Sequence, residues 1–506
     1  MRKRILPLLL SIIICLAGCR GDLSDITNSA AQQTINAAPS QSSSSDVSFD
    51  EIRSINIPYD PEDSLLPYTA ATSVNRYVCG LIYDSLVRLR PDYSYEKVMA
   101  KQISSEDYTV WTITIPGNIT FPDGDVYSAD DVKYSLMRAM TEGSFYAQSL
   151  SGVGNVAVKD DYNVEVTLLE ADRYFANLLT FPIIEYGTME SPVGVGRYTL
   201  SSDKRTLTCN TAGAPIDTIN LVDISDSSML LQETRIGVFD CVYIEDPTSV
   251  SMSSIGGADP VPLNNLVYLG MNSHLGFTSG AKFRSAIEKV IDRGYIADTV
   301  YGGHAAAAPS VFNPAFYEMD AGLSRGADPQ EANSLLDDLG YTERDSDGYR
   351  VSGYSGQRIV LDLAVNNESS VKMAAAAGIK NMLKQIGVDV NIVGYSYQAY
   401  LSAVENGAAE LYIAEIKLPA DMDVTQLISP EGTASYGLYT SDDLYADWLS
   451  LRSGNFSYAD FDAAFYDATP FAPLVYRYGD FVYSRNFYFD VKATENDIFY
   501  NILEWE

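Results

Sequence analysis

A strand, a helix and a second strand follow one another between residues 358 and 393, and this pattern limits the possible folds more than any other stretch. Arg358–Asn366 has the pattern of a strand, Ser369–Ile386 that of a helix ending at Gly387, and Val388–Val393 that of an alternating strand. In such a βαβ unit the two strands are parallel and the crossover is right-handed. The sequence therefore predicts an α/β fold for this part of the chain.

Two further stretches carry the start signals of helices. Asp328, Pro329 and Glu331 supply an N-cap, a proline at the first helical position and a capping-box acid. Ser128 and Asp131 repeat the N-cap and capping-box pair in the first third of the chain. The other elements expected in this third are a helix over 75–87 and strands over 52–57, 109–115 and 162–168. Helices and strands are thus expected to intermingle here too.

The length of the chain implies more than one hydrophobic core. A single core rarely extends beyond roughly 250–300 residues, whereas this chain has 506, so we expect two or three lobes. The formal charge is −33, and because residues 1–18 carry three cations and no acid, the charge without them is −36. So acidic a protein is a poor partner for nucleic acid, whose binding depends on clustered Lys and Arg, and for anionic lipid surfaces.

The first nineteen residues have the pattern of an export signal. A basic start is followed by an apolar run over 5–16, which is too short for a membrane span, and then by Ala17-Gly18-Cys19. The LAGC ending resembles the bacterial lipobox, which implies cleavage before Cys19 and a diacylglycerol anchor on that residue; a plain secretory signal is the alternative. Residues 19–50, poor in aromatics and rich in Ser, Ala, Gln and Asn, are predicted to form a flexible tether.

The chain shows no pattern of catalysis or of metal binding. Cys79, Cys209 and Cys241 form no disulfide framework and have no metal-ligand spacing. His274 and His304 are the two histidines, so a zinc site is improbable, and a serine or cysteine triad would have to use one of them as its base. Nucleophile-elbow, phosphate-loop and His-Glu-x-x-His motifs are absent from the sequence. We therefore expect a protein that is not an enzyme and has no cofactor and no resident metal.

The order of several segments carries a family resemblance. In chain order these are NRYVCGLIYDSLVRL, TVWTITI, FPDGDVYSADDVKYSLMRA, DDYNVEVTL, PVGVGRYTL, YLGMNSHLGFTSGAKFRSAIEKVIDR and TPFAPLVYRYGDFVYSR. Together they resemble the extracellular solute-binding proteins of family 5, the peptide and nickel class that serves ABC importers. The resemblance implies a two-lobed α/β fold like that of type II periplasmic binding proteins, with an extra subdomain. Lobe I would comprise residues 51–82, 190–268 and 471–506, its subdomain 83–189, and lobe II 269–470.

The resemblance also implies a function. The protein would capture a small solute between its lobes, with a short peptide favoured, and deliver it to an ABC permease and its ATPase. It would be a monomer, held outside the cytoplasm on the bacterial cell membrane by its lipid. A surface sensor or chaperone-like binding lipoprotein on the same fold is the alternative, and a permease and ATPase encoded nearby would separate the two.

Asp421 is the residue that the resemblance assigns to the ligand. In the family's peptide binders an aspartate at this place holds the ligand's α-amino group, and Lys417, Leu418 and Asp423 are its neighbours here. The alternative is that Asp421 and Asp423 merely cap the segment that follows. Those peptide binders tend to carry tryptophan where this chain has Leu418, and Asp-Pro where it has Asp423-Val424, which questions a standard peptide specificity. Nickel is less favoured still, because soft and imidazole ligands are scarce.

Five further residues are weaker candidates for the ligand site. Tyr395, Tyr397 and Tyr400 follow the second strand of the βαβ unit, and tyrosine can both stack on a ligand and form a hydrogen bond with it. Asn75 and Arg76 precede the first helix, and Arg76 is a possible partner for a ligand carboxylate. Packing in the core is the alternative for the tyrosines, and a solvated surface position for Arg76.

Overall fold

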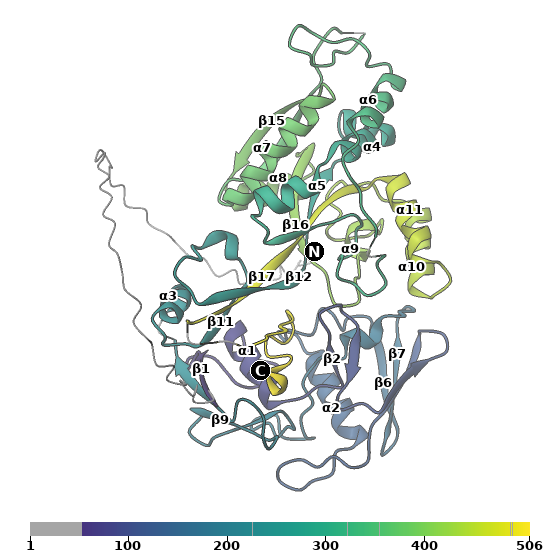
Figure 1. Ribbon diagram of the computed structural model, residues 1–506. Helices are drawn as coiled ribbons and strands as arrows, with labels where there is room; N and C mark the ends of the chain where they lie inside the picture. The colour runs from purple at the N-terminus through teal and green to yellow at the C-terminus, as the bar shows by residue number, and fades with distance from the viewer. Residues whose placement is uncertain are drawn as a thin grey trace, which may run out of the picture. The chain divides into compact units, whose positions relative to one another are not determined.

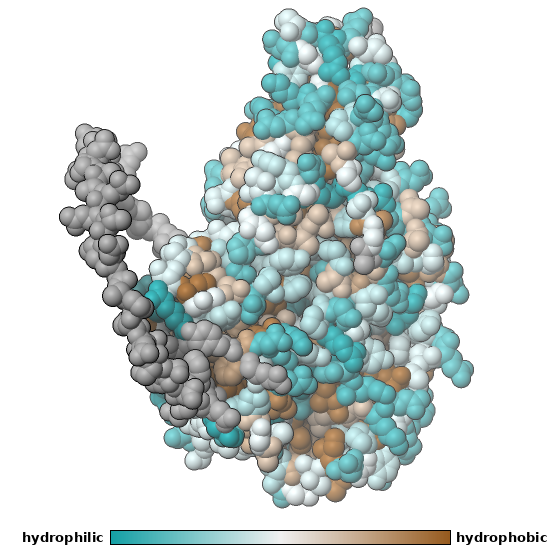
Figure 2. Space-filling view, in the orientation of Figure 1, coloured by the Kyte–Doolittle hydropathy of each residue, from teal (hydrophilic) through white to brown (hydrophobic). Residues whose placement is uncertain are grey.

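The computed structural model describes residues 53–505, apart from residues 225, 321, 354, 486 and 488. The predicted export signal over 1–18, the lipidation site at Cys19 and the tether over 19–50 lie outside the described residues. Among the residues that are described, no helix is both long and apolar enough to cross a bilayer. The face shown in Figure 2 is mostly hydrophilic, and its hydrophobic residues form small separate patches.

A seven-stranded mixed sheet is the largest element of the structure, and it contains the predicted βαβ unit. Its strands follow the order β11, β17, β12, β16, β14 and β15, and β13 pairs with β17. They are β11 (Cys241–Ile244), β12 (Gly257–Met271), β13 (Ala305–Ala307), β14 (Val360–Asn366), β15 (Asp389–Tyr395), β16 (Leu411–Lys417) and β17 (Phe471–Tyr483). The strands β14 and β15 are parallel, and α7 (Ser370–Gln385) connects them, which confirms the predicted unit.

Helices cover both faces of this sheet (Figure 1). Along β12, Val267 and Leu269 pack in one hydrophobic core, while Leu266 and Tyr268 pack in another, so the two cores lie on opposite faces. The first core includes residues of α4 (Ala281–Val290), α6 (Pro329–Asp338) and α7. The second includes residues of α8 (Tyr397–Glu405), α9 (Thr425–Ile428), α10 (Asp442–Arg452) and α11 (Tyr458–Ala468). The short helix α5 (Arg293–Tyr295) follows α4. This layering is that of an α/β fold.

The first half of the chain forms three smaller sheets. In one, β1 (Ser54–Tyr59) is parallel to β10 (Thr218–Asp223), followed by β9 (Thr206–Cys209) and β8 (Tyr198–Leu200). The second is antiparallel, in the order β4 (Gln102–Ser105), β5 (Val110–Thr114), β7 (Asn163–Leu168) and β6 (Val153–Asp160). The third is the pair β2 (Val87–Leu89) and β3 (Tyr95–Lys97). The helices here are α1 (Ser73–Ile82), α2 (Ala129–Ala139) and α3 (Leu230–Arg235).

Both predicted capping boxes lead into helices. The backbone N–H of Ser128 donates to Asp131 at 2.7 Å, and α2 begins at the next residue. The Asp328 carboxylate accepts the N–H groups of Gln330 and Glu331, and α6 begins at Pro329. The strands predicted over 109–115 and 162–168 are confirmed as β5 and β7. These elements follow from local sequence because their caps and alternation need no distant partner.

The helix predicted over 75–87 is wrong at its C-terminal end. The helix α1 ends at Ile82, the backbone of Tyr83 is extended, and Val87 already begins β2. The backbone groups beyond Tyr83 bond to distant segments: the N–H of Val87 donates to Leu179, and the carbonyl of Leu86 accepts from Val98. The apolar spacing of this stretch was compatible with a helix, but these tertiary partners favour a strand.

The strands β12 and β17 join the large sheet to the rest of the chain. Figure 1 shows them running alongside one another, and their antiparallel pairing extends from Gly257 and Tyr483 to Gly270 and Phe471. The register of this pairing shifts between Pro262 and Leu266 and again between Val267 and Tyr268, so the ladder is irregular there. Because β11 falls within the predicted lobe I and β14, β15 and β16 within the predicted lobe II, one sheet crosses the predicted boundary. The lobe boundaries themselves stay predictions.

Candidate functional site

A cavity of about 580 Å³ lies between segments that are far apart in the sequence. Residues 145–180 line one side, and residues 416–427 with 445–452 line the other. This volume falls within the range of roughly 300–1,000 Å³ that is usual for small-molecule sites. A smaller cavity of about 100 Å³ adjoins it and shares Phe145, Tyr146, Thr180, Lys417, Glu495 and Asn496 with it. We call the two adjoining cavities together the cleft.

The loop that carries Asp421 is held through its backbone. The strand β16 ends at Lys417, and every carbonyl group from residue 418 to 421 then accepts a hydrogen bond from a buried side chain. These donors are Asn264 to Leu418 (3.1 Å) and to Pro419 (2.8 Å), Asn177 to Ala420 (3.2 Å), and Arg452 to Asp421 (3.0 Å). The loop is therefore fixed by groups from β12, from the 145–180 side and from α10.

A left-handed residue follows Asp421 directly. Met422 has φ +58°, a conformation that costs a non-glycine residue about 1 kcal/mol or more. Its N–H donates to Pro419 at 3.0 Å, which closes a tight turn around Asp421. The Met422 side chain is buried in the hydrophobic core beside the helices α9 and α10. This packing holds the turn in its strained conformation and aims Asp421 at the cavity.

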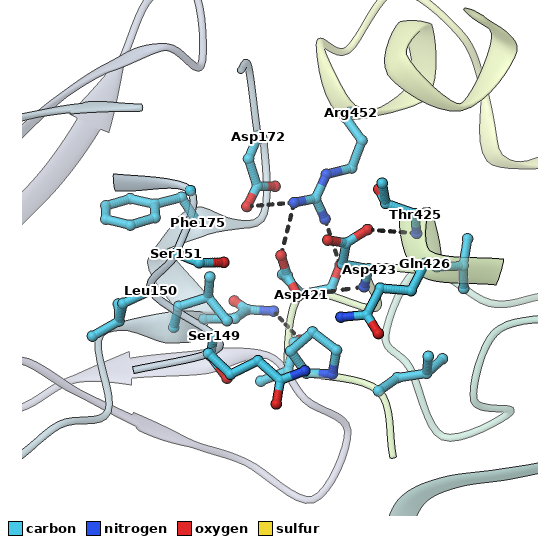
Figure 3. A pocket seen from close by; sticks show the side chains of 18 of the residues that line it. Ser149, Leu150, Ser151, Asp172, Phe175, Asp421, Asp423, Thr425, Gln426 and Arg452 are labelled. Atoms are coloured by element: carbon cyan, nitrogen blue, oxygen red, sulfur yellow. Dashed lines mark hydrogen bonds and ion pairs between the residues drawn. The ribbon is translucent and has the colours of Figure 1, made fainter. Parts of the chain in front are cut away.

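Among the residues that line the cavity, a guanidinium group lies between two carboxylates (Figure 3). Arg452 Nη2 lies 2.7 Å from Asp421 Oδ2 and 2.9 Å from Asp172 Oδ2. Asp172, Asp421 and Arg452 are only 5%, 3% and 8% exposed. Asp423 lies beside them, half-buried, and accepts the N–H of Thr425 at 2.8 Å. We call Asp172, Asp421, Asp423 and Arg452 the acid cluster.

Burial and charge shift the acidities within the acid cluster. Burial raises the pKa of Asp172 well above its usual value, although Arg452 opposes the rise, and the charge of Asp421 adds to it. Burial also raises the pKa of Asp421, again against the effect of Arg452 and with a contribution from Asp423. In both groups burial is the largest cause of the rise in pKa, and the guanidinium group that the two carboxylates share opposes it only in part.

The charges that line the cavity are mostly negative. Among the described residues its wall contains five acids and two cations: Glu170, Asp172, Asp421, Asp423 and Glu495 against Lys417 and Arg452. The acids would exceed the cations by three charges if all of them were ionised. Lys417 Nζ lies 3.5 Å from Glu495, so this cation is already shared with a carboxylate. A ligand that carries an ammonium group therefore fits the electrostatics of the cavity better than an anion.

The structure brings four of the predicted site residues together. Lys417, Leu418, Asp421 and Asp423 all line the larger cavity. Arg76 lines the smaller adjoining cavity, where its guanidinium carbon lies 4.6 Å from the centre of the Phe145 ring. The capping alternative also has a basis, because Asp423 accepts the N–H at the start of α9.

The other four predicted residues lie away from the cavity walls. Asn75 is buried, and its amide exchanges hydrogen bonds with both backbone groups of Asp60, so it fastens the loop before α1. The Tyr400 hydroxyl donates to the Ile413 carbonyl at 2.6 Å within the core. Tyr397 is 45% exposed on α8, and Tyr395 ends β15 beside it. Neither cavity includes any of these four residues.

Several residues that shape the site were not predicted. Asp172 follows β7 in an irregular segment, and Arg452 is the basic residue in the last turn of α10, where a cation at a helix C-terminus is unremarkable. Asn177 is a single amide in an apolar stretch, and Asn264 belongs to an Asn-Asn pair within one. None of them stands out locally, because each becomes part of the site only through contacts across the fold.

The cavity offers little to a bare metal ion. Its described lining contains no histidine and no cysteine. Within residues 53–505, the five gaps excepted, no three His, Cys, Asp or Glu side chains are grouped so that they could hold a metal. His304 instead lies 3.4 Å from Asp480 on β17. The donor set therefore does not fit nickel as a free ion, which prefers imidazole and related ligands.

Comparison with known proteins identifies the family. Residues 94–429 match the family described as "Bacterial extracellular solute-binding proteins, family 5 Middle". The nickel-binding periplasmic protein of Escherichia coli is 21% identical over 354 residues, and the dipeptide-binding protein DppE of Bacillus subtilis is 23% identical over 363. These matches cover 62% and 63% of this chain and 66% of each relative's length.

Solved structures share the fold. A substrate-binding protein of an ABC transporter from Sinorhizobium meliloti superposes with a TM-score of 0.72 at 18% identity, covering 90% of this chain and 99% of that one. The murein tripeptide-binding protein MppA, in its unliganded open form, gives 0.71 at 19% identity, covering 85% and 93%. NikZ of Campylobacter jejuni, in complex with Ni(L-His), gives 0.62 at 18% identity, covering 90% and 99%.

Proposed function

Because the chain belongs to the bacterial extracellular solute-binding proteins of family 5, we propose that it is the substrate-binding component of an ABC importer and captures a short peptide. The observation that carries the peptide assignment is the acidic cavity built around Asp421. Delivery to a permease with its ATPase, and attachment to the membrane through lipid on Cys19, are parts of the same proposal. No bond is made or broken by the protein in this role.

The acid cluster is suited to a peptide's α-ammonium group. Asp421 uses Oδ2 to bind Arg452, while Oδ1 accepts only a long, 3.3 Å hydrogen bond from the Asp423 N–H. An ammonium group between Asp421 Oδ1 and the Asp423 carboxylate would form charge-assisted hydrogen bonds in a site sheltered from water. Arg452 can stay in place during this binding, so the ligand adds a cation without displacing one.

Apolar walls beside the acid cluster suit the side chains of a peptide. Leu150, Phe175 and Trp448 line the cavity and are almost fully buried. Phe145 and Leu169 line it as well, but they are 52% and 70% exposed, so they stand where an entering ligand would cover them. A wall of this kind combined with a few charged groups is typical of sites for amphipathic small ligands.

In a two-lobed fold, binding of a ligand between the lobes favours their closed arrangement. A ligand that contacts residues 145–180 and residues 416–452 at the same time binds the closed arrangement more tightly than an open one. The equilibrium between the two is then shifted by the ratio of these affinities. A permease could recognise the closed arrangement and so distinguish loaded from empty protein.

A thermal-shift screen tests the peptide assignment. Di- to pentapeptides with free amino termini, sugars, and nickel with and without free histidine are each added to the full chain. A ligand that binds only the folded state must raise the melting temperature. We expect peptides to do so. Stabilisation by sugars or by the nickel–histidine mixture, with none by peptides, would overturn the assignment.

Asp421→Asn tests the anchor for the amine. The amide keeps the shape of the carboxylate and can still accept from Arg452, but it removes one negative charge. We expect a free-amine peptide to lose about tenfold or more in affinity, since a charge-assisted hydrogen bond contributes about 1.5–3 kcal/mol, while the N-acetylated peptide loses much less. Asp130→Asn, at an exposed acid in the first turn of α2, is the matched control. Equal losses for both peptides would count against an amine anchor.

A further inference from the structure

The acid cluster links the charge of the ligand to closure of the cleft. We propose that Asp172 is a specificity-determining residue: closure buries it against Arg452 and Asp421, and the ammonium group of the ligand supplies the positive charge that this buried cluster lacks. The proposal rests on the function proposed above, but it makes a separate claim about the empty protein. A neutral or anionic ligand of the same shape would not supply the positive charge that the acid cluster lacks.

Asp172 and its partners come from opposite sides of the cleft. Asp172 belongs to the side formed by residues 145–180, whereas Asp421 and Arg452 belong to the other side. The backbone continues the contact, because the N–H of Arg173 donates to the carbonyl of Arg452 at 2.8 Å. Arg173 and the Tyr174 hydroxyl both bind Glu318, at 2.9 and 2.7 Å. The segment 172–174 thus contacts Arg452 on the second side through the Asp172 side chain and the Arg173 backbone, and it also binds Glu318.

The cluster at this contact is short of positive charge. Asp172 and Asp421 approach the same nitrogen of Arg452, and Asp423 lies next to them. If all three acids were ionised, the buried group would carry two negative charges in excess of its guanidinium. An uncompensated buried charge is strongly unfavourable. The empty closed cleft relieves this by keeping a proton on one of its acids, and Asp172, whose pKa is raised well above its usual value, is the acid that we assign it to.

The charged and titratable groups around Asp172 support this assignment of the proton. Those facing it or its immediate partners are Arg452 and Tyr445 on α10, Asp421 and Asp423 before α9, Glu318 and Tyr317 across the cleft, and Glu170, Arg173 and Tyr174 on its own segment. Arg173 is held by Glu318, so it does not offset the cluster. Burial and the Asp421 charge together raise the pKa of Asp172, which favours its protonated form in the empty closed cleft.

Closure of the empty cleft should therefore depend on pH with a definite sign. In an open cleft Asp172 is solvated and has an ordinary pKa near 3.8. Since the closed state binds the proton more tightly, closure is most favourable below that value. Closure then weakens by up to about tenfold per pH unit as the pH rises towards the raised value. A bound ammonium group replaces the proton, so closure around a cationic ligand should lose this dependence.

Small-angle X-ray scattering of the full chain without ligand tests the proposal. We expect the wild-type protein to have a smaller radius of gyration at about pH 5 than at about pH 8, in line with proton-linked closure. Asp172→Asn, which mimics the protonated acid, should give the smaller value at both pH values. Asp130→Asn removes an exposed carboxylate on α2 that lines neither cavity, so it is the matched control and should behave as the wild type.

A second variant keeps the test decisive if the first is ambiguous. Arg452→Gln removes the cation and should give the larger radius at both pH values, opposite in sign to Asp172→Asn; far-UV circular dichroism confirms that each variant is folded. The proposal is overturned if Asp172→Asn keeps the wild-type pH dependence. It is also overturned if Arg452→Gln closes as readily as the wild type. Because no ligand is present, failure of the peptide assignment leaves this result unaffected, and the reverse holds as well.

Discussion

Glu415 and Asp421 are close in sequence, yet they belong to two clusters of charged side chains with opposite charge balance. Glu415 on β16 receives Arg477 at 2.7 Å and Lys372 at 2.9 Å, so one carboxylate faces two cations. In the acid cluster two carboxylates share Arg452. The first cluster lies within the large sheet and its covering helix, whereas the second spans the cleft.

The acidities of the two clusters follow from this balance. Burial alone would raise the pKa of Glu415, but Lys372 and Arg477 outweigh it and lower the pKa to about 2. The pKa of Asp172 is raised, because burial prevails where the cation is shared. A cluster whose carboxylate charge is balanced by cations of the protein stabilises the fold without a ligand. A cluster with too few cations can bind a cation from a ligand. The difference separates a structural ion pair from a binding site.

Replacing an acid by its amide should have opposite consequences in the two clusters. Glu415→Gln leaves Lys372 and Arg477 facing a neutral group, and we expect it to lower the free energy of unfolding by about 3 kcal/mol. Asp172→Asn replaces an acid whose neutral form burial already favours, so it should change the free energy of unfolding by less than about 1 kcal/mol. Urea unfolding at neutral pH, followed by circular dichroism, measures both. Similar losses in the two variants would contradict the distinction.

Neighbouring asparagines on β12 allow the two clusters to be perturbed separately. Asn264 donates to the carbonyls of Leu418 and Pro419 below Asp421, whereas Asn265 donates to Glu415 at 2.9 Å. We expect Asn264→Ala to cost about 2 kcal/mol of stability, since it leaves buried carbonyl groups unpaired. Because the loop that carries Asp421 loosens, it should also weaken binding of the peptide found in the thermal-shift screen by about tenfold.

Asn265→Ala is the matched control for that variant. It should cost about 1 kcal/mol, because Glu415 keeps both of its cations, and leave the affinity for the peptide unchanged. Calorimetric titration of both variants with the same peptide measures the contrast. If Asn265→Ala weakened the affinity as much as Asn264→Ala, the two clusters would have to be treated as one coupled unit.

The sequence predicted the parts of this molecule that depend on local rules. The capped helices α2 and α6 and the unit of β14, α7 and β15 follow from caps, glycine stops and alternation, which act over a few residues. The end of α1 was not predictable in this way, because Leu86 and Val87 take their hydrogen-bond partners from distant segments. Local signals therefore predicted which helices and strands form, whereas the end of a helix such as α1 also depends on tertiary contacts.

The site divides along the same line. Asp421 could be proposed from the sequence because its loop has a recognisable place in the order of segments, and the structure shows that it lines the cavity with its neighbours Lys417, Leu418 and Asp423. Asp172 and Arg452 could not, because their significance lies in a contact between segments far apart in the sequence. Tyr395, Tyr397 and Tyr400 were chosen for their chemistry alone, and sequence gives no direction for a side chain after a strand ends.

Lys372→Met should have the smallest effect and gives the finest test of charge balance. It removes one of the two cations on Glu415, and since Lys372 is on a partly exposed face of α7, we expect a loss of about 1 kcal/mol at neutral pH. The wild-type Glu415 contributes stability above its ordinary pKa of 4.5, and this is lost as the pH falls towards about 2.

With one cation gone, the pKa of Glu415 should rise towards its ordinary value, so the variant has less stability to lose between these limits. Urea midpoints measured over this acid range should therefore fall less steeply for Lys372→Met than for the wild type. Lys380→Met, at a half-buried lysine of the same helix, should keep the wild-type slope. An unchanged slope for Lys372→Met would mean that Arg477 alone sets the acidity of Glu415, and that a carboxylate with one cation is compensated as well as one with two. In that case, the shortage of positive charge at Asp172 and Asp421 would be due only to their sharing one guanidinium group. It would not mean that a buried carboxylate generally needs two cations.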